Sequence, residues 1–270
     1  MELWPVAVAM PDRKFDSIGG EIDVRRREAF DASPRVIAGA TWRDHRDAAA
    51  WGSALPADLD LVVYCAHGHA VSQAATALLH AAGRRGRYVA GGFAAYVAAG
   101  GTTVLRGVVP AAADGGPSRW VTRERPKVDR IGCPWLLRRF VDPQARIFYV
   151  APDQVQEAAR ELAAVPFDID GVEFSHRGEL CSFDTFLDRF GLEDAALRHV
   201  ARIVRGADTA RLDLEPQAAG LLAMALGLSA VYENDHAALA AGMAFYDGLY
   251  GWARFARGET HNWPAAPAPG

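Results

Sequence analysis

Apolar runs alternate with helix-like stretches along the first hundred residues. The clearest run is Leu61–Tyr64, and helix-like sequence follows it after a short loop. Continuous apolar runs of this length are typical of strands buried in a parallel sheet. The predicted strands are 22–24, 36–38, 61–64 and 88–90, and the predicted helices are 25–32, 72–82 and 94–99. This alternation predicts an α/β domain, a parallel sheet with helices on both faces.

The pattern changes after a segment of small, flexible residues, Ala-Ala-Ala-Asp-Gly-Gly-Pro-Ser, which is typical of a linker. Beyond it, strands are predicted at 120–122 and 146–150, and the remaining pattern favours helices. The predicted helices are 131–140, 154–164, 182–190, 193–204, 216–226 and 235–255, with Ser182 as an N-cap. The chain therefore divides into an α/β domain, a linker, a mainly α-helical domain and a disordered tail. Their predicted ranges are 1–110, 111–118, 119–262 and 263–270.

Composition and charge narrow the classes of function. The chain has 270 residues, half of them hydrophobic, and a net charge of −4, so bulk charge gives no reason to expect nucleic acid. Three cysteines without a C-x-x-C pair favour reduced thiols over a disulfide scaffold. We find no signal peptide and no apolar run long enough to span a membrane. We therefore expect a cytoplasmic protein without membrane contact, and the sequence leaves its oligomeric state open.

Cys65 is the first candidate for chemistry. It ends the apolar run 61–64 and opens a loop that leads into the next helix. A thiol in this position faces free backbone N–H groups, which lower its pKa and favour the reactive thiolate. The predicted anion-binding loop consists of Ala66, His67, Gly68, His69, Ala70 and Val71. The alternative is an inert buried cysteine, which is common after an apolar run.

Two histidines in this loop allow two interpretations. As imidazolium, His67 and His69 would strengthen anion binding, and as neutral rings they would shuttle protons. The alternative is that both are simply exposed loop residues.

Four short segments add a family resemblance. They are Ile22–Arg25 with Glu28 and Phe30, Gly39–Ala40, Val62–Cys65 with Gly68, and Gly91–Phe93 with Tyr96 and Gly100. Together they resemble a single rhodanese (sulfurtransferase) domain over residues 15–105. The resemblance implies a ping-pong reaction in which Cys65 takes sulfur from a donor such as thiosulfate, holds it as a persulfide and passes it to cyanide or a thiol. No cofactor is required for this transfer.

Neighbouring positions refine that resemblance. Asp23 and Arg25 are expected to have structural roles beside the site, within an ion-pair network. Rhodanese-like phosphatases carry an arginine six residues after the cysteine, where it grips phosphate. This chain has Val71 there, which argues against phosphatase activity.

Basic residues gather between positions 119 and 139. This segment contains seven arginines and lysines and only two acidic residues, Glu124 and Asp129. Guanidinium groups match tetrahedral anions in shape and charge, which predicts an oxyanion site. The candidates are Arg123, Arg125, Lys127 and Arg130. A solvated basic surface is the alternative. A nucleic-acid patch is less favoured, because the run is short and the protein is acidic.

Side chains of the kinds that bind transition metals also gather in the second half. The candidate ligands are His176, Glu179, Cys181, Asp208 and His236. Imidazole, carboxylate and thiolate ligands suit a divalent ion such as zinc, manganese or iron. None of these spacings is a recognised metal motif, so the alternative is a polar network that joins helices.

A second resemblance covers this half of the chain. The matching segments are Val128–Phe140, Ser175–Phe183, Val204–Asp208 and Asp247–Tyr250. They resemble the C-terminal domain of the chromate-resistance protein ChrB over residues 119–262. That family is associated with chromate resistance and with chromate-responsive control of an efflux transporter. The resemblance implies a link between sulfur transfer and chromate stress, with chromate or a sulfate-like oxyanion as a candidate ligand.

Two alternative functions follow from the same residues. One is a chromate- or redox-responsive transcriptional regulator without turnover, in which Cys65 is a switch and the basic run contacts DNA. The other is a chromate reductase that uses Cys133 or Cys181, although no flavin or nicotinamide fingerprint supports it.

Overall fold

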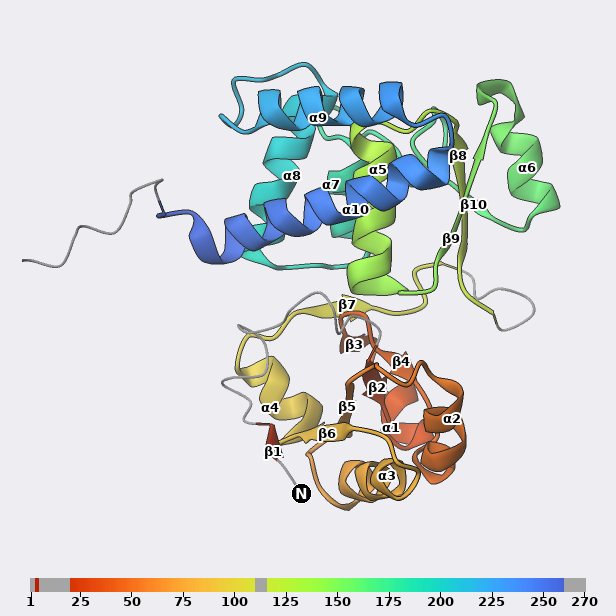
Figure 1. Ribbon diagram of the computed structural model, residues 1–270, viewed down its shortest axis with the longest axis vertical. Helices are drawn as coiled ribbons and strands as arrows, with labels where there is room; N and C mark the ends of the chain where they lie inside the picture. The colour runs from red at the N-terminus through yellow and green to blue at the C-terminus, as the bar shows by residue number, and fades with distance from the viewer. Residues whose placement is uncertain (1–2, 5–19, 110–115, 260–270) are drawn as a thin grey trace, which may run out of the picture.

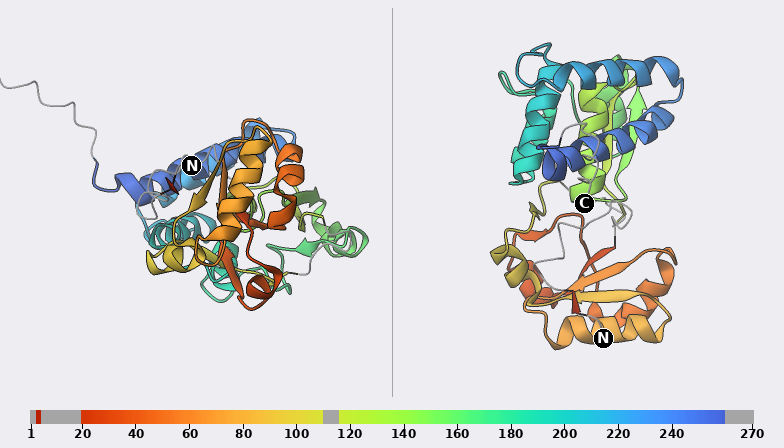
Figure 2. Two further views of the ribbon diagram at one scale, coloured as in Figure 1. Left: turned by 90° about the horizontal axis from the view of Figure 1, so that it is seen from below. Right: turned by 60° about the vertical axis from the view of Figure 1, so that its left-hand side comes forward.

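The computed structural model describes residues 3–4, 20–109 and 116–259. Figure 1 shows two lobes stacked along the long axis, and the right-hand view of Figure 2 shows them again one above the other. The linker predicted at 111–118 and the tail predicted at 263–270 lie mostly or wholly outside the described residues. No described helix combines the length and the apolar character that crossing a bilayer requires.

The first lobe is built on a five-stranded sheet in the order β1-β6-β5-β2-β4, and every neighbouring pair is parallel. The strands are β1 (Leu3–Trp4), β2 (Glu21–Asp23), β4 (Thr41–Trp42), β5 (Leu61–Tyr64) and β6 (Gly86–Val89). The apolar run that predicted β5 is a strand between β2 and β6. In that place both faces of the strand must be apolar.

Helices cover both faces of this sheet, as the sequence predicted. They are α1 (Arg27–Asp31), α2 (Ala48–Ala54), α3 (Ala70–Ala81) and α4 (Gly92–Ala98), with a 3-10 turn η2 (His45–Asp47) before α2. Trp51 of α2 and Leu79 of α3 pack against Val63 in one buried cluster. On the opposite face, Tyr96 of α4 packs with Tyr64 and β6 in another cluster.

An antiparallel ribbon leaves the first lobe and contacts the second. It pairs β3 (Arg35–Ile37) with β7 (Thr103–Leu105), and the sequence did not predict β7. Its residues Val36 and Val104 are buried in the main core of the second lobe. Two backbone hydrogen bonds also cross there, from Gly39 N–H to the Phe140 carbonyl at 2.7 Å and from Leu105 N–H to the Phe190 carbonyl at 2.8 Å.

The second lobe combines a small parallel sheet with a larger helical layer. The sheet has the order β10-β8-β9, formed by β8 (Arg119–Arg123), β9 (Arg146–Val150) and β10 (Val165–Pro166). Helix α6 (Val155–Glu161), preceded by the turn η4 (Pro152–Gln154), packs against Val121 of β8. The other helices are α5 (Val128–Leu136), α7 (Ser182–Arg189), α8 (Ala195–Asp208), α9 (Ala218–Val231) and α10 (Asp235–Gly251).

Helix α5 lies at the centre of this layer, where Trp135 is fully buried among Phe140, Phe183, Tyr246 and Tyr250. Wider π-helical turns continue two of the helices, η3 (Leu137–Val141) after α5 and η5 (Trp252–Ala256) after α10. The prediction of a mainly helical second domain is therefore confirmed, with a three-stranded sheet on its edge.

The N-cap prediction for α7 was wrong by one residue. Cys181 caps the helix, and its backbone N–H donates to the Asp184 carboxylate in a capping box. The Ser182 hydroxyl instead donates to Asp168 at 2.7 Å. A serine at a helix start satisfies the cap pattern, but here a buried carboxylate from another segment takes its hydrogen bond.

Candidate functional site

The Cys65 thiol follows directly after β5 and is 6% exposed. Its sulfur lies 3.2 Å from the hydroxyl oxygen of Ser72, in the first turn of α3. The Ser72 hydroxyl also lies within hydrogen-bond distance of the His69 carbonyl, at 3.3 Å. A hydroxyl has one proton, so it can donate to a Cys65 thiolate or, when the thiol is protonated, to that carbonyl.

Opposing effects act on this sulfur. Burial raises the pKa of the Cys65 thiol, but the Ser72 hydroxyl and the backbone N–H groups of His67, Ser72 and His69 lower it. The hydrogen bonds outweigh burial, and the pKa falls below its usual range. The arrangement therefore favours the thiolate, the nucleophilic form of cysteine.

The loop after Cys65 is held in shape by the start of α4. The Phe93 N–H donates to the Cys65 carbonyl at 2.8 Å, and the Ala94 N–H donates to the Ala66 carbonyl at 3.1 Å. These bonds turn the first loop carbonyls toward α4, while later N–H groups face the sulfur. Gly68 has φ +69°, and a Cβ there would lie 2.6 Å from the Gly91 nitrogen. Only glycine fits this close approach of two backbones.

The remaining loop residues surround the sulfur less directly. The His67 and His69 side chains are exposed, and their ring centroids are 6.1 Å apart. Ala66 and Val71 are half-buried, and Ala70 is exposed at the start of α3. Of the six predicted loop residues, His67 and His69 thus supply amides that face the sulfur, and Ser72 adds a donor that the sequence did not single out.

Asp23 and Arg25 form a buried ion pair beside the loop. The Arg25 guanidinium donates to both oxygens of Asp23, the shortest bond being 2.6 Å, and the Tyr64 hydroxyl donates to Asp23 at 3.0 Å. The guanidinium also lies over the Phe93 ring, 4.4 Å from its centroid. This network joins β2, β5 and the start of α4, so its geometry fits the structural role expected of both residues.

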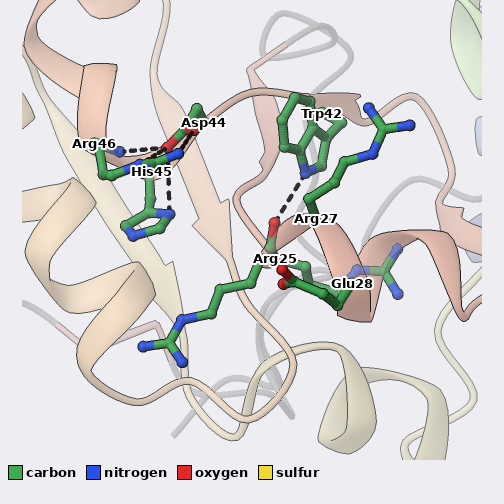
Figure 3. Close-up of a pocket in the computed structure, with 8 residues that line it drawn as sticks. Arg25, Arg27, Glu28, Trp42, Asp44, His45 and Arg46 are labelled. Carbon is green, nitrogen blue, oxygen red and sulfur yellow. Dashed lines mark hydrogen bonds and ion pairs between the residues drawn. The ribbon is translucent and has the colours of Figure 1, made fainter.

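A basic cavity of about 260 Å³ opens at the same edge of the sheet (Figure 3). It is lined by Arg25, Arg26, Arg27, Glu28, Trp42, Asp44, His45 and Arg46. The Trp42 indole N–H donates to the Arg25 carbonyl at 2.9 Å, which joins the ends of β2 and β4. Since β2 lies between β4 and β5, the cavity and Cys65 share the carboxyl edge of one parallel sheet. This edge is where α/β folds bind ligands.

A second cluster of polar side chains lies in the other lobe. It comprises Asp129 in the first turn of α5, His176 in the loop before α7, and Asp208 at the end of α8. The His176 Nε2 atom lies 3.0 Å from Asp208 Oδ2 and 3.8 Å from Asp129 Oδ2. One ligand atom from each residue lies within 4.8 Å of the others. The structure thus brings two predicted ligands together with Asp129, which the sequence did not select.

The other predicted ligands lie elsewhere. Glu179 is exposed, and the buried Cys181 thiol donates to Asp184 at 3.4 Å. His236 packs edge-on against the Tyr149 ring, 5.5 Å between centroids. Among the described residues, the cluster with metal-binding geometry contains none of these three.

Asp168 flanks the cluster and connects it to the basic run. Arg123 and Arg130 both face its Oδ2 atom, at 3.1 and 3.4 Å. Of the other oxyanion candidates, Arg125 donates to the Ser229 carbonyl at 3.2 Å, and Lys127 is an exposed residue before α5. Two of the four predicted oxyanion residues therefore pair with a carboxylate of the protein.

The charges of this cluster perturb one another. Burial, together with Asp208 and Asp168, raises the pKa of Asp129 well above its usual range. The Asp168 carboxylate, with help from Asp129 and Asp208, raises the pKa of His176 to about 9 against the effect of burial. Strongly perturbed groups that converge in one place are typical of functional sites.

Cys133 and Cys181 differ from Cys65. Both are fully buried, and burial and nearby carboxylates raise the pKa of each thiol well above its usual range. Neutral buried thiols are poor nucleophiles. Their surroundings therefore do not favour the reductase alternative.

Family comparisons divide the chain in the same way. Residues 12–99 match the rhodanese-like domain family, and residues 120–253 match the ChrB C-terminal domain family. A curated relative, Protein ChrB of Cupriavidus metallidurans, is 34% identical over 133 residues. That match covers 49% of this chain and 40% of the relative, so the chain spans less than half of that protein.

Two solved structures are similar to part of this chain. The Rhodanese_3 like domain of an Anabaena protein is 34% identical and covers 32% of this chain and 97% of its own, with a TM-score of 0.28. A rhodanese-related protein of Thermoplasma volcanium is 24% identical and covers 39% of this chain and 100% of its own, with a TM-score of 0.32. By its two family matches, this chain joins a rhodanese-like domain, which carries the Cys65 loop, to a ChrB C-terminal domain, which carries the cluster of Asp129, His176 and Asp208.

Proposed function

We propose that the protein is a sulfurtransferase in which Cys65 carries the transferred sulfur. The observation behind this proposal is that the Ser72 hydroxyl, 3.2 Å from the sulfur, and the N–H groups of residues 67, 69 and 72 all lower the pKa of the Cys65 thiol. Such donors stabilise a thiolate, and they would equally stabilise the negative terminal sulfur of a persulfide.

The reaction has two displacement steps. The Cys65 thiolate attacks the outer sulfur of thiosulfate, the S–S bond of thiosulfate breaks, and sulfite leaves with the electron pair. A nucleophile such as cyanide or a thiolate then attacks the outer sulfur of the Cys65 persulfide, and Cys65 leaves as the thiolate. The donors that stabilise the thiolate before the first step therefore also stabilise the leaving group of the second.

The basic cavity at the same edge of the sheet as Cys65 favours an anionic donor. Four arginines line it against the carboxylates of Glu28 and Asp44. Arg46 pairs with Asp44 at 2.6 Å and holds the pKa of that carboxyl far below its usual range, so Asp44 stays charged and orients the guanidinium. Arg26, which is exposed at the cavity, can face the sulfonate oxygens of thiosulfate.

We infer that this chemistry serves chromate resistance in the cytoplasm. The match to the ChrB C-terminal domain supports the link to chromate. The three free cysteines support the compartment, because Cys65 must stay a reduced thiol to act as a nucleophile. Chromate and sulfate have the same shape and charge, so a protein that handles sulfur oxyanions is chemically placed to meet chromate.

Intact-protein mass spectrometry after incubation with thiosulfate tests the transfer. We expect the wild-type chain to gain one sulfur atom and to lose it on addition of cyanide, whereas Cys65→Ser gains none. The variant keeps Cys133 and Cys181, so it also controls for the other two thiols. Sulfur uptake by Cys65→Ser, or none by the wild type from thiosulfate or an organic persulfide, would contradict the proposal.

The same variant tests the link to chromate. Cells in which Cys65→Ser replaces the wild-type chain should tolerate less chromate, because sulfur transfer is lost while the second domain is unchanged. Equal chromate tolerance of the variant and the wild type would show that sulfur transfer at Cys65 does not contribute to chromate resistance. Salt-sensitive binding of the wild-type chain to promoter DNA, with no sulfur uptake, would favour the regulator instead.

A further inference from the structure

We propose that Asp129, His176 and Asp208 bind one divalent transition-metal ion, of the group that accepts imidazole and carboxylate ligands together, such as Mn²⁺, Fe²⁺ or Zn²⁺. The site lies in the second lobe and does not involve Cys65. It therefore stands or falls independently of sulfur transfer.

The distances between the ligand atoms suit a single ion. Metal–ligand bonds to nitrogen and oxygen are about 2.0–2.2 Å long, so two ligands of one ion lie at most about 4.4 Å apart. The His176 Nε2 atom is 3.0 Å from Asp208 Oδ2 and 3.8 Å from Asp129 Oδ2. All three ligand atoms lie within 4.8 Å of one another, so small rotations of these side chains would bring them to bonding distance.

A buried carboxylate oxygen without a hydrogen-bond partner points to a cation as its ligand. Asp129 is 1% exposed, and its Oδ1 atom has no hydrogen-bond partner among the described residues. Its Oδ2 atom accepts a long bond, 3.3 Å, from the Phe183 N–H, and the Ser182 N–H also acts on this carboxylate. Buried carboxylate oxygens are almost always satisfied, so this one calls for a ligand that the protein does not supply.

Charge compensation divides the carboxylates into two kinds. Asp168 faces Arg123 and Arg130 and accepts from Ser182, so its charge is balanced within the protein. Within 4 Å, Asp129 and Asp208 have only His176 as an ion-pair partner among the described residues, and Arg130 acts on Asp208 from farther away. A divalent ion bound to these two carboxylates and a neutral imidazole would balance the remaining charge.

Asp168 borders the same ring nitrogen of His176 that would bind the ion. Asp168 Oδ1 lies 3.6 Å from His176 Nε2, and Ser182 fixes that carboxylate at 2.7 Å. A nitrogen that binds an ion carries no proton, so the ion would replace this contact, and the Asp168 carboxylate would stay beside the site. The His176 side chain is 42% exposed, which gives an ion a path from solvent and leaves room for water or an anion as further ligands.

The ligand chemistry also limits the choice of ion. One nitrogen and two carboxylate oxygens suit zinc, manganese or iron, and neither Cys133 nor Cys181 belongs to the ligand group among the described residues. A soft ion such as Cu⁺, which prefers sulfur, is not expected to bind here.

Metal titration of the full chain tests the proposal. After removal of metals with a chelator, native mass spectrometry and calorimetric titration with Mn²⁺ and with Zn²⁺ should each show one ion per chain for at least one of these metals. Asp208→Asn and His176→Gln should each lower the affinity about tenfold or more. The control Glu179→Gln removes an exposed carboxylate three residues after His176 and should bind like the wild type.

Folding of each variant is checked by its circular dichroism and by sulfur uptake at Cys65, which the proposal leaves unchanged. His176→Gln alters a partly exposed loop residue, so it keeps the test valid should Asp208→Asn unfold. The proposal is overturned if the wild type binds neither metal at millimolar concentration, or if His176→Gln binds as tightly as the wild type. If the wild type binds neither metal, the protonated His176 is the cation that balances the two carboxylates.

Discussion

At Cys65, burial and hydrogen bonding act on one sulfur atom in opposite directions. Burial by itself would give the inert thiol that Cys133 and Cys181 illustrate. Cys65 differs because a loop of N–H groups and the Ser72 hydroxyl surround it, and their combined effect lowers its pKa. The reactivity of the site therefore depends on donors rather than on exposure.

Ser72→Ala isolates one of these donors. Loss of the hydroxyl raises the pKa of Cys65, so less thiolate is present at acidic and neutral pH and the variant's pH–rate profile moves to higher pH. A hydrogen bond to a charged group contributes about 1.5–3 kcal/mol, which predicts a loss of about tenfold or more in thiosulfate turnover at low pH. Turnover should recover at alkaline pH, where the thiol ionises without help.

Rates of thiocyanate formation from thiosulfate and cyanide, measured across the pH range, report this shift. Ser53→Ala is the matched control, since it removes an exposed helical hydroxyl that bonds only to the Ala49 carbonyl. A profile of Ser72→Ala that is lowered equally at every pH would mean that Ser72 positions the loop without affecting ionisation.

The residues of the Cys65 site could be predicted to different degrees. Cys65 and its loop were found because a buried strand followed by a glycine-containing loop is a local pattern. Ser72 has no such signal, since a serine in a first helical turn is common. In the second lobe, Asp129 and Asp208 meet only because α5 and α8 come together, and no spacing in the sequence records that packing.

At the scale of elements, the shape of the Cys65 loop depends on its contact with the turn between β6 and α4. Gly68→Ala and Gly83→Ala test this contact as a pair, because both glycines have positive φ, +69° and +72°. A Cβ at Gly68 would lie 2.6–2.8 Å from backbone atoms of residues 89, 91 and 92, whereas one at Gly83 meets nothing within 4 Å. Both variants carry the strain of a left-handed alanine, about 1–2 kcal/mol.

We expect Gly83→Ala to lose stability only by the amount of that strain and to keep its turnover. Gly68→Ala should be less stable by a further margin and should lose most of its turnover, because the loop must shift and carry its N–H groups away from the sulfur. Urea denaturation and the thiosulfate assay measure both effects. Equal losses in the two variants would show that the contact with the β6–α4 turn does not shape the site.

Elements with a strong local pattern were predicted, and elements that depend on neighbours were not. The apolar runs of β5 and β9 predicted both strands with their observed bounds. Strand β4 has two residues and exists through its pairing with β2, and β7 exists through its pairing with β3. Helix α2 was missed because its alanine-rich sequence follows a charged 3-10 turn and lacks a clear start signal.

At the scale of the whole molecule, the β3–β7 ribbon links the two domains. Val36 and Ala38 lie within the rhodanese-like match and Val104 lies just after it, but all three are buried with the core of the ChrB half. Arg35 adds a hydrogen bond to the Gly191 carbonyl at 3.0 Å, and Thr102 adds one to Asp194 at 3.2 Å. The two segments that match different families thus share one hydrophobic core where they meet.

Val104→Ala tests whether this shared core couples the domains. Val104 is 2% exposed, so losing two methyl groups there should cost about 2 kcal/mol, whereas Val97→Ala, at a position 47% exposed on α4, should cost little. If the core is shared, hydrogen exchange in Val104→Ala should accelerate both in β3 and in residues 186–192, which face the ribbon from the other lobe. Faster exchange confined to β3 and β7 would show that the second domain keeps its stability without the ribbon. The Cys65 loop and the polar cluster would then belong to domains that fold independently.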